Sequence, residues 1–245
     1  MNQRLAPDLF CFPLQIGALC SGRAVGDALL RVLRPFGMST YAIGVCPHPD
    51  FPYPGGFVVD NWPTQWRDLY LAENMGEHDP MLHAVQLNSN PVSVQDIRDG
   101  RAGFAPLPEE LAVLDAGARL GRPHGLIVPI FGAQGYRGIG CVCGPGPDPD
   151  ARARIVLQFL VWHAHERMRA LYAAQTGAET LGLSLREREV LNAARRGLSD
   201  EEIAQAAAIT VRTVRFHFEN ARRKLSARNR TEAIAKAVQL QLLGV

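Results

Sequence analysis

The spacing of hydrophobic positions in the first part of the chain changes between the repeat of a helix and that of a strand. Val25, Leu29 and Leu33 recur every four residues, which is typical of a helix that buries one face. Tyr41, Ile43 and Val45 alternate with smaller residues, which is typical of a strand. The same reasoning predicts helices over residues 22–36, 64–75, 106–120 and 151–172, a short helix that opens at Asp79-Pro80, and strands over residues 38–46, 56–60, 125–131 and 136–143.

The order of these elements indicates an α+β fold. The strands over residues 125–131 and 136–143 flank the glycine-containing residues 132–135, so we expect them to form a hairpin. Helices before and after a few antiparallel strands predict an α/β/α sandwich with a central antiparallel sheet. The closing helix carries an apolar stripe that either covers this sheet or contacts a second copy of the chain, formed by Ile155, Phe159, Trp162 and Leu171.

Residues 183–245 have a purely helical pattern with well-marked helix starts. Ser184 and Ser199 are each followed three residues later by a glutamate, a spacing at which the two side chains cap the first helical turn reciprocally. We expect Thr210 to cap a third helix after a tight turn, and Thr231 to cap a fourth. The fourth helix either packs on the other three or contacts a second copy of the chain. This part is therefore expected to be a small all-α domain with a helix-turn-helix.

Length and charge support a division into two domains. A chain of 245 residues is long for one small domain, and residues 173–182 are small and polar, as in a linker. From residue 173 onward the chain has 12 basic and 8 acidic residues, against 14 and 16 before it, so the positive charge lies in the C-terminal part. We expect one domain over residues 1–172, a linker over 173–182 and a second domain over 183–245.

The third helix of the C-terminal domain has a basic face of the kind that enters the major groove of DNA. Two short helices, a tight turn and a basic helix are the minimum for this mode of binding. Arginine can donate two hydrogen bonds to guanine, glutamate can accept one from cytosine, and threonine at a helix start can bind phosphate. A solvated charged face on a helical bundle would have the same pattern. The candidate DNA-binding residues are Thr210, Arg212, Thr213, Arg215, His217, Glu219, Arg222 and Lys224.

The C-terminal domain also resembles a known family. The segments LSLREREVL, LSDEEIA and ITVRTVRFHFEN, with Glu187, Leu191 and Gly197, are similar to the DNA-binding domain of LuxR-type transcription regulators. The resemblance covers nearly all of residues 183–243 and implies binding to double-stranded DNA. Because this domain also occurs in two-component response regulators, it does not identify the N-terminal domain.

Trp66, Tyr70 and Asp79 form a candidate small-molecule site in the N-terminal domain. Trp66 and Tyr70 are one helical turn apart and therefore share a helix face. Aromatic rings beside a buried carboxylate can enclose an apolar group of a ligand while the carboxylate accepts a hydrogen bond from a ligand N–H. An ordinary aromatic core with an aspartate that caps a helix has the same pattern.

This part of the chain is similar to the autoinducer-binding domain of the LuxR family. Trp66, Tyr70, Asp79, Pro80 and Gly125 match five characteristic positions of that domain at the family's spacing. The resemblance implies an N-acyl-homoserine lactone ligand whose lactone carbonyl accepts from Trp66 and whose amide N–H donates to Asp79, with Tyr70 lining the acyl pocket. The order of elements typical of a response-regulator receiver domain does not occur in the sequence.

Three positions depart from the family's pattern. Trp62 stands where the family has a tyrosine that binds the acyl carbonyl, Val94 where it has a tryptophan against the lactone, and Cys141 where a hydroxyl often faces the ligand. The indole of Trp62 can still donate a hydrogen bond but is larger than a phenol, and a thiol is a poorer partner than a hydroxyl. We therefore expect polar recognition to depend mainly on Trp66 and Asp79, in an acyl pocket suited to short, branched or aromatic groups.

The remaining chemistry-bearing residues indicate no metal site and no catalysis. The five cysteines lack disulfide or zinc spacing, although Cys141 and Cys143 should place both thiols on one face of a strand. His163 and His165 cannot share a helix face, and the sequence has no nucleophile, phosphate-binding or paired-carboxylate motif. It also has no signal peptide or membrane-helix pattern. We expect a cytoplasmic protein with no cofactor, no metal and no enzyme activity.

Together these patterns predict a ligand-responsive transcription regulator. An N-terminal domain that binds an N-acyl-homoserine lactone and dimerises would set the spacing of two recognition helices on an inverted-repeat promoter site. One alternative is a regulator of the same build that answers to a different small molecule or to none. Another is an enzyme fused to a DNA-binding domain, which no residue in the sequence supports.

Overall fold

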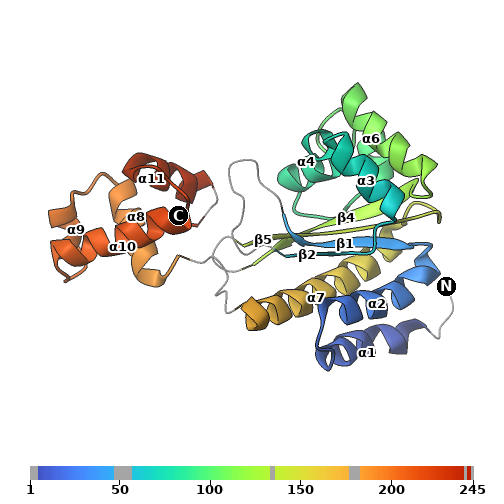
Figure 1. Ribbon diagram of the computed structural model, residues 1–245, viewed down its shortest axis with the longest axis horizontal. Helices are drawn as coiled ribbons and strands as arrows, with labels where there is room; N and C mark the ends of the chain where they lie inside the picture. The colour runs from blue at the N-terminus through green and yellow to red at the C-terminus, as the bar shows by residue number, and fades with distance from the viewer. Residues whose placement is uncertain (1–4, 47–56, 133–135, 177–182, 240–241, 244–245) are drawn as a thin grey trace. The chain divides into compact units, whose positions relative to one another are not determined.

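The computed structural model describes residues 5–46, 57–132, 136–176, 183–239 and 242–243. The chain forms two compact units, one built on a sheet and one made of the C-terminal helices (Figure 1). Helix α7 (Ala151–Thr176) extends four residues into the expected linker, so the linker starts later than the sequence pattern predicted. The rest of that linker, residues 177–182, lies outside the described residues.

The N-terminal unit contains a five-stranded sheet in the order β2-β1-β5-β4-β3. β1 pairs antiparallel with β2 and with β5, and β3 pairs antiparallel with β4, which confirms the expected kind of sheet. β4 and β5 are neighbours, as expected of a hairpin. The strands are β1 (Thr40–Val45), β2 (Val58–Asp60), β3 (Val92–Ser93), β4 (His124–Phe131) and β5 (Arg137–Gly144).

Helices cover both faces of this sheet, as expected of an α/β/α sandwich (Figure 1). One layer contains α1, α2 and α7, and the other contains α3, α4 and α6. The helices before α7 are α1 (Leu5–Gly17), α2 (Gly22–Leu33), α3 (Thr64–Ala72), α4 (Pro80–Leu87), α5 (Val94–Arg98) and α6 (Pro108–Arg119), with 3₁₀ turns η1 (Arg34–Phe36) and η2 (Met75–His78). The sequence pattern did not predict α1, α5 or the short strand β3. No helix in the described ranges combines the length and the apolar character needed to cross a membrane.

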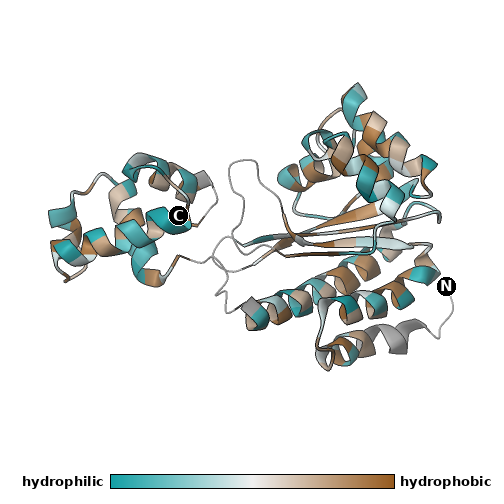
Figure 2. Ribbon diagram, in the orientation of Figure 1, coloured by the Kyte–Doolittle hydropathy of each residue, from teal (hydrophilic) through white to brown (hydrophobic). Residues whose placement is uncertain are grey.

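Alternate side chains of the central strands enter two separate cores. Tyr41, Ile43 and Val142 are buried against α1, α2 and α7. Ala42 and Cys141 point to the opposite face, toward the other helical layer. Hydrophobic residues accordingly concentrate along the central strands, between the two layers of helices (Figure 2).

The long helix α7 buries only part of its expected apolar stripe. Leu160 and Val161 are fully buried against the sheet, whereas Ile155 and Trp162 are 69% and 44% exposed. The stripe therefore does not cover the sheet as one face, although Phe159 and Leu171 are partly buried there. Because α7 carries apolar residues on several sides, its largest side chains did not indicate which face is buried.

The C-terminal unit is a four-helix bundle, as expected, with α8 (Leu185–Arg195), α9 (Asp200–Ala206), α10 (Val211–Lys224) and α11 (Arg230–Gln239). Both predicted capping boxes are present. The backbone N–H of Ser184 donates to Glu187 Oε2 over 2.7 Å, and that of Ser199 donates to Glu202 Oε2 over 2.8 Å. The two serine hydroxyls accept in return from the glutamate backbones.

The third and fourth helices differ in how well their starts were predicted. Thr210 caps α10 as expected, because its Oγ1 accepts from the backbone N–H of Thr213 over 3.1 Å. Thr231 does not cap α11. Asn229 Oδ1 accepts from the backbone N–H of Glu232 over 2.9 Å, because the helix already begins at Arg230.

Gly125 on β4 lies against β5 with no room for a side chain. A Cβ atom at this position would lie 2.6 Å from the carbonyl oxygen of Val142 and 2.6 Å from Cys143 Sγ. Because one of these neighbours is backbone, the clash could not be relieved by a change of rotamer. The close contact of the two strands therefore requires glycine here.

We expect Gly125→Ala to destabilise the N-terminal unit by about 1–3 kcal/mol, the usual cost of overpacking a buried position. Thermal unfolding followed by circular dichroism measures the effect. Gly17→Ala is the matched control, since a Cβ there would meet nothing within 4 Å. Equal unfolding midpoints for the two variants would contradict the packing role of Gly125.

Candidate functional site

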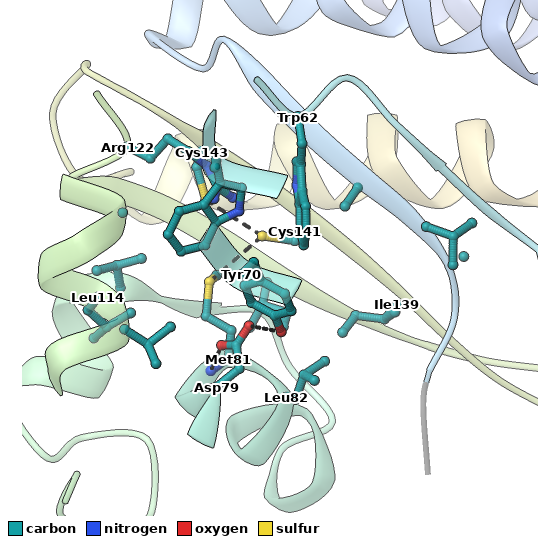
Figure 3. A pocket seen from close by; sticks show the side chains of 18 of the residues that line it. Trp62, Tyr70, Asp79, Met81, Leu82, Leu114, Arg122, Ile139, Cys141 and Cys143 are labelled. Atoms are coloured by element: carbon teal, nitrogen blue, oxygen red, sulfur yellow. Dashed lines mark hydrogen bonds between the residues drawn. The ribbon is translucent and has the colours of Figure 1, made fainter. Parts of the chain in front are cut away.

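A cavity of about 220 Å³ lies between the sheet and the layer that contains α3, α4 and α6 (Figure 3). Typical small-molecule pockets measure about 300–1,000 Å³, so this one suits a compact ligand. Gly125, predicted as a ligand residue, does not line the cavity. The other predicted ligand residues all do, namely Trp62, Trp66, Tyr70, Asp79, Val94 and Cys141.

Three aromatic side chains form one wall of the cavity. Trp66 and Tyr70 lie one turn apart on α3, as expected, with ring centroids 5.5 Å apart. Trp62 packs against both rings, 6.0 Å from Trp66 and 5.0 Å from Tyr70. The backbone N–H of Trp62 donates to Asp60 Oδ1 over 2.9 Å, which fixes the chain just before α3 begins.

Asp79 combines the two roles that the sequence left as alternatives. Its Oδ1 accepts from the backbone N–H of Met81 over 2.9 Å and so caps α4. Its Oδ2 faces the cavity wall and accepts from the Tyr70 hydroxyl over 2.8 Å. Burial raises the pKa of Asp79 above its usual value, although the bonds from Tyr70 and Met81 act in the opposite direction. Burial and the nearby Asp79 carboxylate also raise the pKa of Tyr70, which keeps its hydroxyl neutral.

Arg122 also lines the cavity, although no motif in the sequence indicates it. Its side chain is only 7% exposed, and its guanidinium carbon lies 4.5 Å from the ring centroid of Trp66 and 5.4 Å from that of Trp62. Arg122 Nε donates to Thr40 Oγ1 over 3.2 Å. An arginine in the loop between a helix and a strand is usually solvated. No hydrophobic pattern in the sequence marks this one as buried.

Three sulfur atoms meet at the cavity. Cys141 Sγ lies 3.6 Å from Cys143 Sγ and 3.7 Å from Met81 Sδ. This confirms that both thiols lie on one face of β5. The hydrogen bond to Cys143 and burial raise the pKa of Cys141, whereas the bond from Cys141 and the charge of Arg122 lower the pKa of Cys143. Cys141 therefore remains a neutral thiol.

Two donors of the aromatic wall have no acceptor. Within the described ranges, Trp62 Nε1 and Trp66 Nε1 are buried and make no hydrogen bond. Buried donors without partners destabilise a protein, so an oxygen atom of a bound ligand would gain by meeting them. Val94, the first residue of α5, adds only apolar surface to the cavity.

The C-terminal unit presents the predicted DNA-binding face on α10. All eight predicted residues lie on this helix or at its cap, and none is buried. Val214 and Phe218 on the opposite face pack into the bundle core. Thr210 Oγ1 lies 2.8 Å from Thr213 Oγ1, so two hydroxyls meet at the start of the helix.

Two cations at the end of α10 already have acidic partners. Arg222 donates to both carboxylate oxygens of Glu219 over 2.8 and 2.6 Å. Lys224 Nζ donates to Glu187 Oε2 over 2.8 Å and so links α10 to the cap of α8. These side chains are less available to DNA than their charge alone suggests.

The two arginines nearer the start of α10 are exposed to solvent, and the side chain of Arg215 is more exposed than those of the two cations at the helix end. No hydrogen bond of the Arg212 side chain occurs in the part of the chain that the structure describes, and the residue is exposed. Arg215 Nε donates to Asp200 Oδ2 over 3.2 Å, while the other oxygen of Asp200 accepts from Arg230. Burial acts to raise the pKa of Asp200, but the bonds from Arg230 and Arg215 outweigh it and lower the pKa.

Comparison with known protein families accounts for both units. Residues 21–168 match the autoinducer binding domain family. Residues 181–237 match the luxR family of bacterial regulatory proteins. The two matches follow one another along the chain and together cover most of it.

Curated relatives match over nearly their whole length. The transcriptional activator protein BjaR1 of Bradyrhizobium diazoefficiens is 29% identical over 222 residues, which are 89% of this chain and 88% of the relative. The HTH-type quorum sensing-dependent transcriptional regulator RpaR of Rhodopseudomonas palustris is 32% identical over 207 residues, 84% of this chain and 83% of the relative.

Solved structures with the same fold include Escherichia coli SdiA, with a TM-score of 0.68, 20% identity and coverage of 95% of this chain and 96% of SdiA. SdiA in complex with octanoyl-rac-glycerol has the same TM-score at 18% identity and covers 100% of this chain and 99% of that one. The family matches, the relatives and the fold agree on one assignment. The chain belongs to the LuxR family of transcription regulators, which are not enzymes, and consists of an autoinducer-binding domain followed by a helix-turn-helix DNA-binding domain.

Proposed function

We propose that the autoinducer of this protein is an N-acyl-homoserine lactone, bound in the cavity between the sheet and α3. The observation that carries the proposal is that an unpartnered donor, Trp66 Nε1, and a buried acceptor, Asp79, belong to the same cavity. The lactone carbonyl accepts from Trp66 and the ligand amide N–H donates to Asp79, so that both buried groups gain a partner. Tyr70 lines the acyl pocket, and Trp62 supplies a second donor.

The acyl group in this proposal is short, branched or aromatic. The cavity measures about 220 Å³, which leaves little space beyond a lactone ring and its amide. Trp62 brings an indole to a position where the family has a smaller phenol, and this ring packs directly on Tyr70. Flat or compact groups fit such an aromatic wall through offset or edge contacts.

A second candidate is a different small molecule with an acyl chain. SdiA shares this fold and has been solved with octanoyl-rac-glycerol, so the fold can hold an acylated ligand that has no lactone. In the present chain, Val94 and Cys141 offer a lactone less contact than a tryptophan and a hydroxyl would. A regulator that needs no ligand is less well supported, because it would leave Trp66 Nε1 without an acceptor.

We further propose that the protein acts as a homodimer on an inverted-repeat promoter site. Each helix-turn-helix reads one half-site, and two-fold symmetry of the protein matches the repeat in the DNA. Ile155 and Trp162 support a contact between copies, because they lie two turns apart on one side of α7 and both are exposed. Ligand binding shifts the dimeric arrangement that spaces the two α10 helices. Binding to promoter DNA would place the protein in the cytoplasm, as we expect.

Asp79→Asn should abolish lactone-dependent activation of a promoter reporter and weaken lactone binding in isothermal titration. An asparagine oxygen can still cap α4, so the fold should persist. Its amide group, however, would turn a donor toward the ligand N–H where the carboxylate has an acceptor.

Asp115→Asn, at an exposed carboxylate on α6, is the control and should respond like the wild type. Circular dichroism shows whether each variant is folded. A folded Asp79→Asn protein with an unchanged response would place the ligand site elsewhere.

Lactones with longer acyl chains should bind more weakly than short, branched or aromatic ones. The cavity of about 220 Å³ has to expand to admit a long chain, which disturbs packed side chains. Isothermal titration of the wild type across a series of acyl chains measures this. Tightest binding of a long straight chain would contradict a compact acyl pocket.

Arg215→Ala should reduce sequence-specific DNA affinity by roughly 1–3 kcal/mol, as expected for an arginine that contacts a base. Fluorescence anisotropy with an inverted-repeat duplex, obtained by selection from a random library, measures the change against a scrambled duplex. Intact specificity in Arg215→Ala would mean that another face of the helix reads the bases.

Arg228→Ala removes the same charge from an exposed position outside α10 and serves as the control. It should weaken binding to both duplexes equally, through loss of long-range attraction alone.

A duplex with a single half-site should bind more weakly than the full repeat, since a dimer engages both halves together.

A further inference from the structure

The cavity wall contains a full positive charge that the proposed lactone does not need. Arg122 is 93% buried, and its guanidinium lies over the rings of Trp66 and Trp62 at 4.5 and 5.4 Å from their centroids. Arginine remains charged at all relevant pH values. A buried cation destabilises a protein strongly unless it is paired and hydrogen-bonded.

The described residues satisfy this guanidinium only in part. Arg122 Nε donates to Thr40 Oγ1 over 3.2 Å, and a second bond reaches the Cys143 thiol. Five N–H groups are available on the side chain, so donors exceed these acceptors. Across the described ranges no carboxylate lies within ion-pair distance of Arg122. Asp79 acts on it only through space, and its oxygens already accept from Tyr70 and Met81.

The neighbouring indoles add to the excess of donors. Trp62 Nε1 and Trp66 Nε1 belong to the same rings that Arg122 covers, and both are buried without an acceptor. Three N–H side chains thus gather in one part of the cavity. In Figure 3, Arg122 and Asp79 lie at opposite ends of the group of labelled side chains. One end of the cavity therefore offers donors and the other an acceptor.

We propose that Arg122 makes this cavity a site for an N-acylated amino acid with a free carboxylate, such as the ring-opened form of an N-acyl-homoserine lactone. The inference rests on the proposed function, since it uses the same cavity and the same contact between the ligand amide and Asp79. The carboxylate meets Arg122 in a charge-assisted, two-bond contact and also accepts from Trp66 Nε1.

A neutral lactone cannot supply the same contacts. Its carbonyl oxygen has two acceptor positions, of which Trp66 Nε1 uses one, and it brings no charge to balance the guanidinium. A carboxylate brings two oxygens with about four acceptor positions and a full negative charge. Arg122 is thus a specificity-determining residue that favours the acid over neutral ligands of the same size.

The test compares three ligands on the full-length protein by isothermal titration. They are N-butanoyl-homoserine lactone, the ring-opened acid N-butanoyl-homoserine, and the carboxamide of that acid, which has the same shape without the charge. We expect the wild type to bind the acid about 10-fold or more tightly than the carboxamide, the usual range for hydrogen bonds to a charged group. Arg122→Gln should remove that difference, and circular dichroism shows whether the variant is folded.

Arg119→Gln is the control, because it removes the same charge from an exposed position on the neighbouring end of α6 and should preserve the preference for the acid. The inference would be overturned if the wild type bound the acid and the carboxamide equally well. It would also be overturned if Arg122→Gln still preferred the acid. Binding of the lactone without the acid would overturn the inference alone, whereas failure of all three ligands would overturn the proposed function as well.

Discussion

Neighbouring residues of one strand face two different environments in this protein. Because side chains alternate across a sheet, Tyr41 and Ile43 pack against α1, α2 and α7, while Ala42 and Gly44 line the cavity on the other face. The register of β1 against β5 sets Ala42 opposite Cys141 on the cavity side. A shift of one residue would exchange the two faces, so the packing of the core determines which side chains face the cavity.

The polar side chains of the cavity also make hydrogen bonds that hold the fold together. Asp79 caps α4 with one oxygen and holds the Tyr70 hydroxyl with the other. Arg122 is tied to β1 through Thr40, and its guanidinium covers the aromatic wall. In the binding mode that we propose, a ligand would meet groups whose positions are already set by helix capping and by strand packing, which limits how far they must move.

Local signals in the sequence were sufficient for much of the fold. Capping boxes at Ser184 and Ser199 depend on residues three apart, and the alternation of β1 depends on six consecutive residues, so both could be predicted. The buried face of α7 could not, since apolar side chains surround that helix and only the sheet decides which are covered. Arg122 was missed for a related reason. Its burial depends on α6, β1 and the aromatic residues of α3, which are far apart in the sequence, whereas Trp66 and Asp79 could be found from the family's spacing.

The shared carboxylate of Asp200 bears on how α10 would meet DNA in the binding mode that we propose. Its two oxygens are divided between Arg215 on α10 and Arg230 at the start of α11. If Arg215 turned toward a base in that mode, Asp200 would keep Arg230 and would not be left as a bare anion facing the phosphates. Docking on DNA would then exchange the partner of Arg215, whose side chain is already 69% exposed in the free protein, while the ion pair of Asp200 with Arg230 persists.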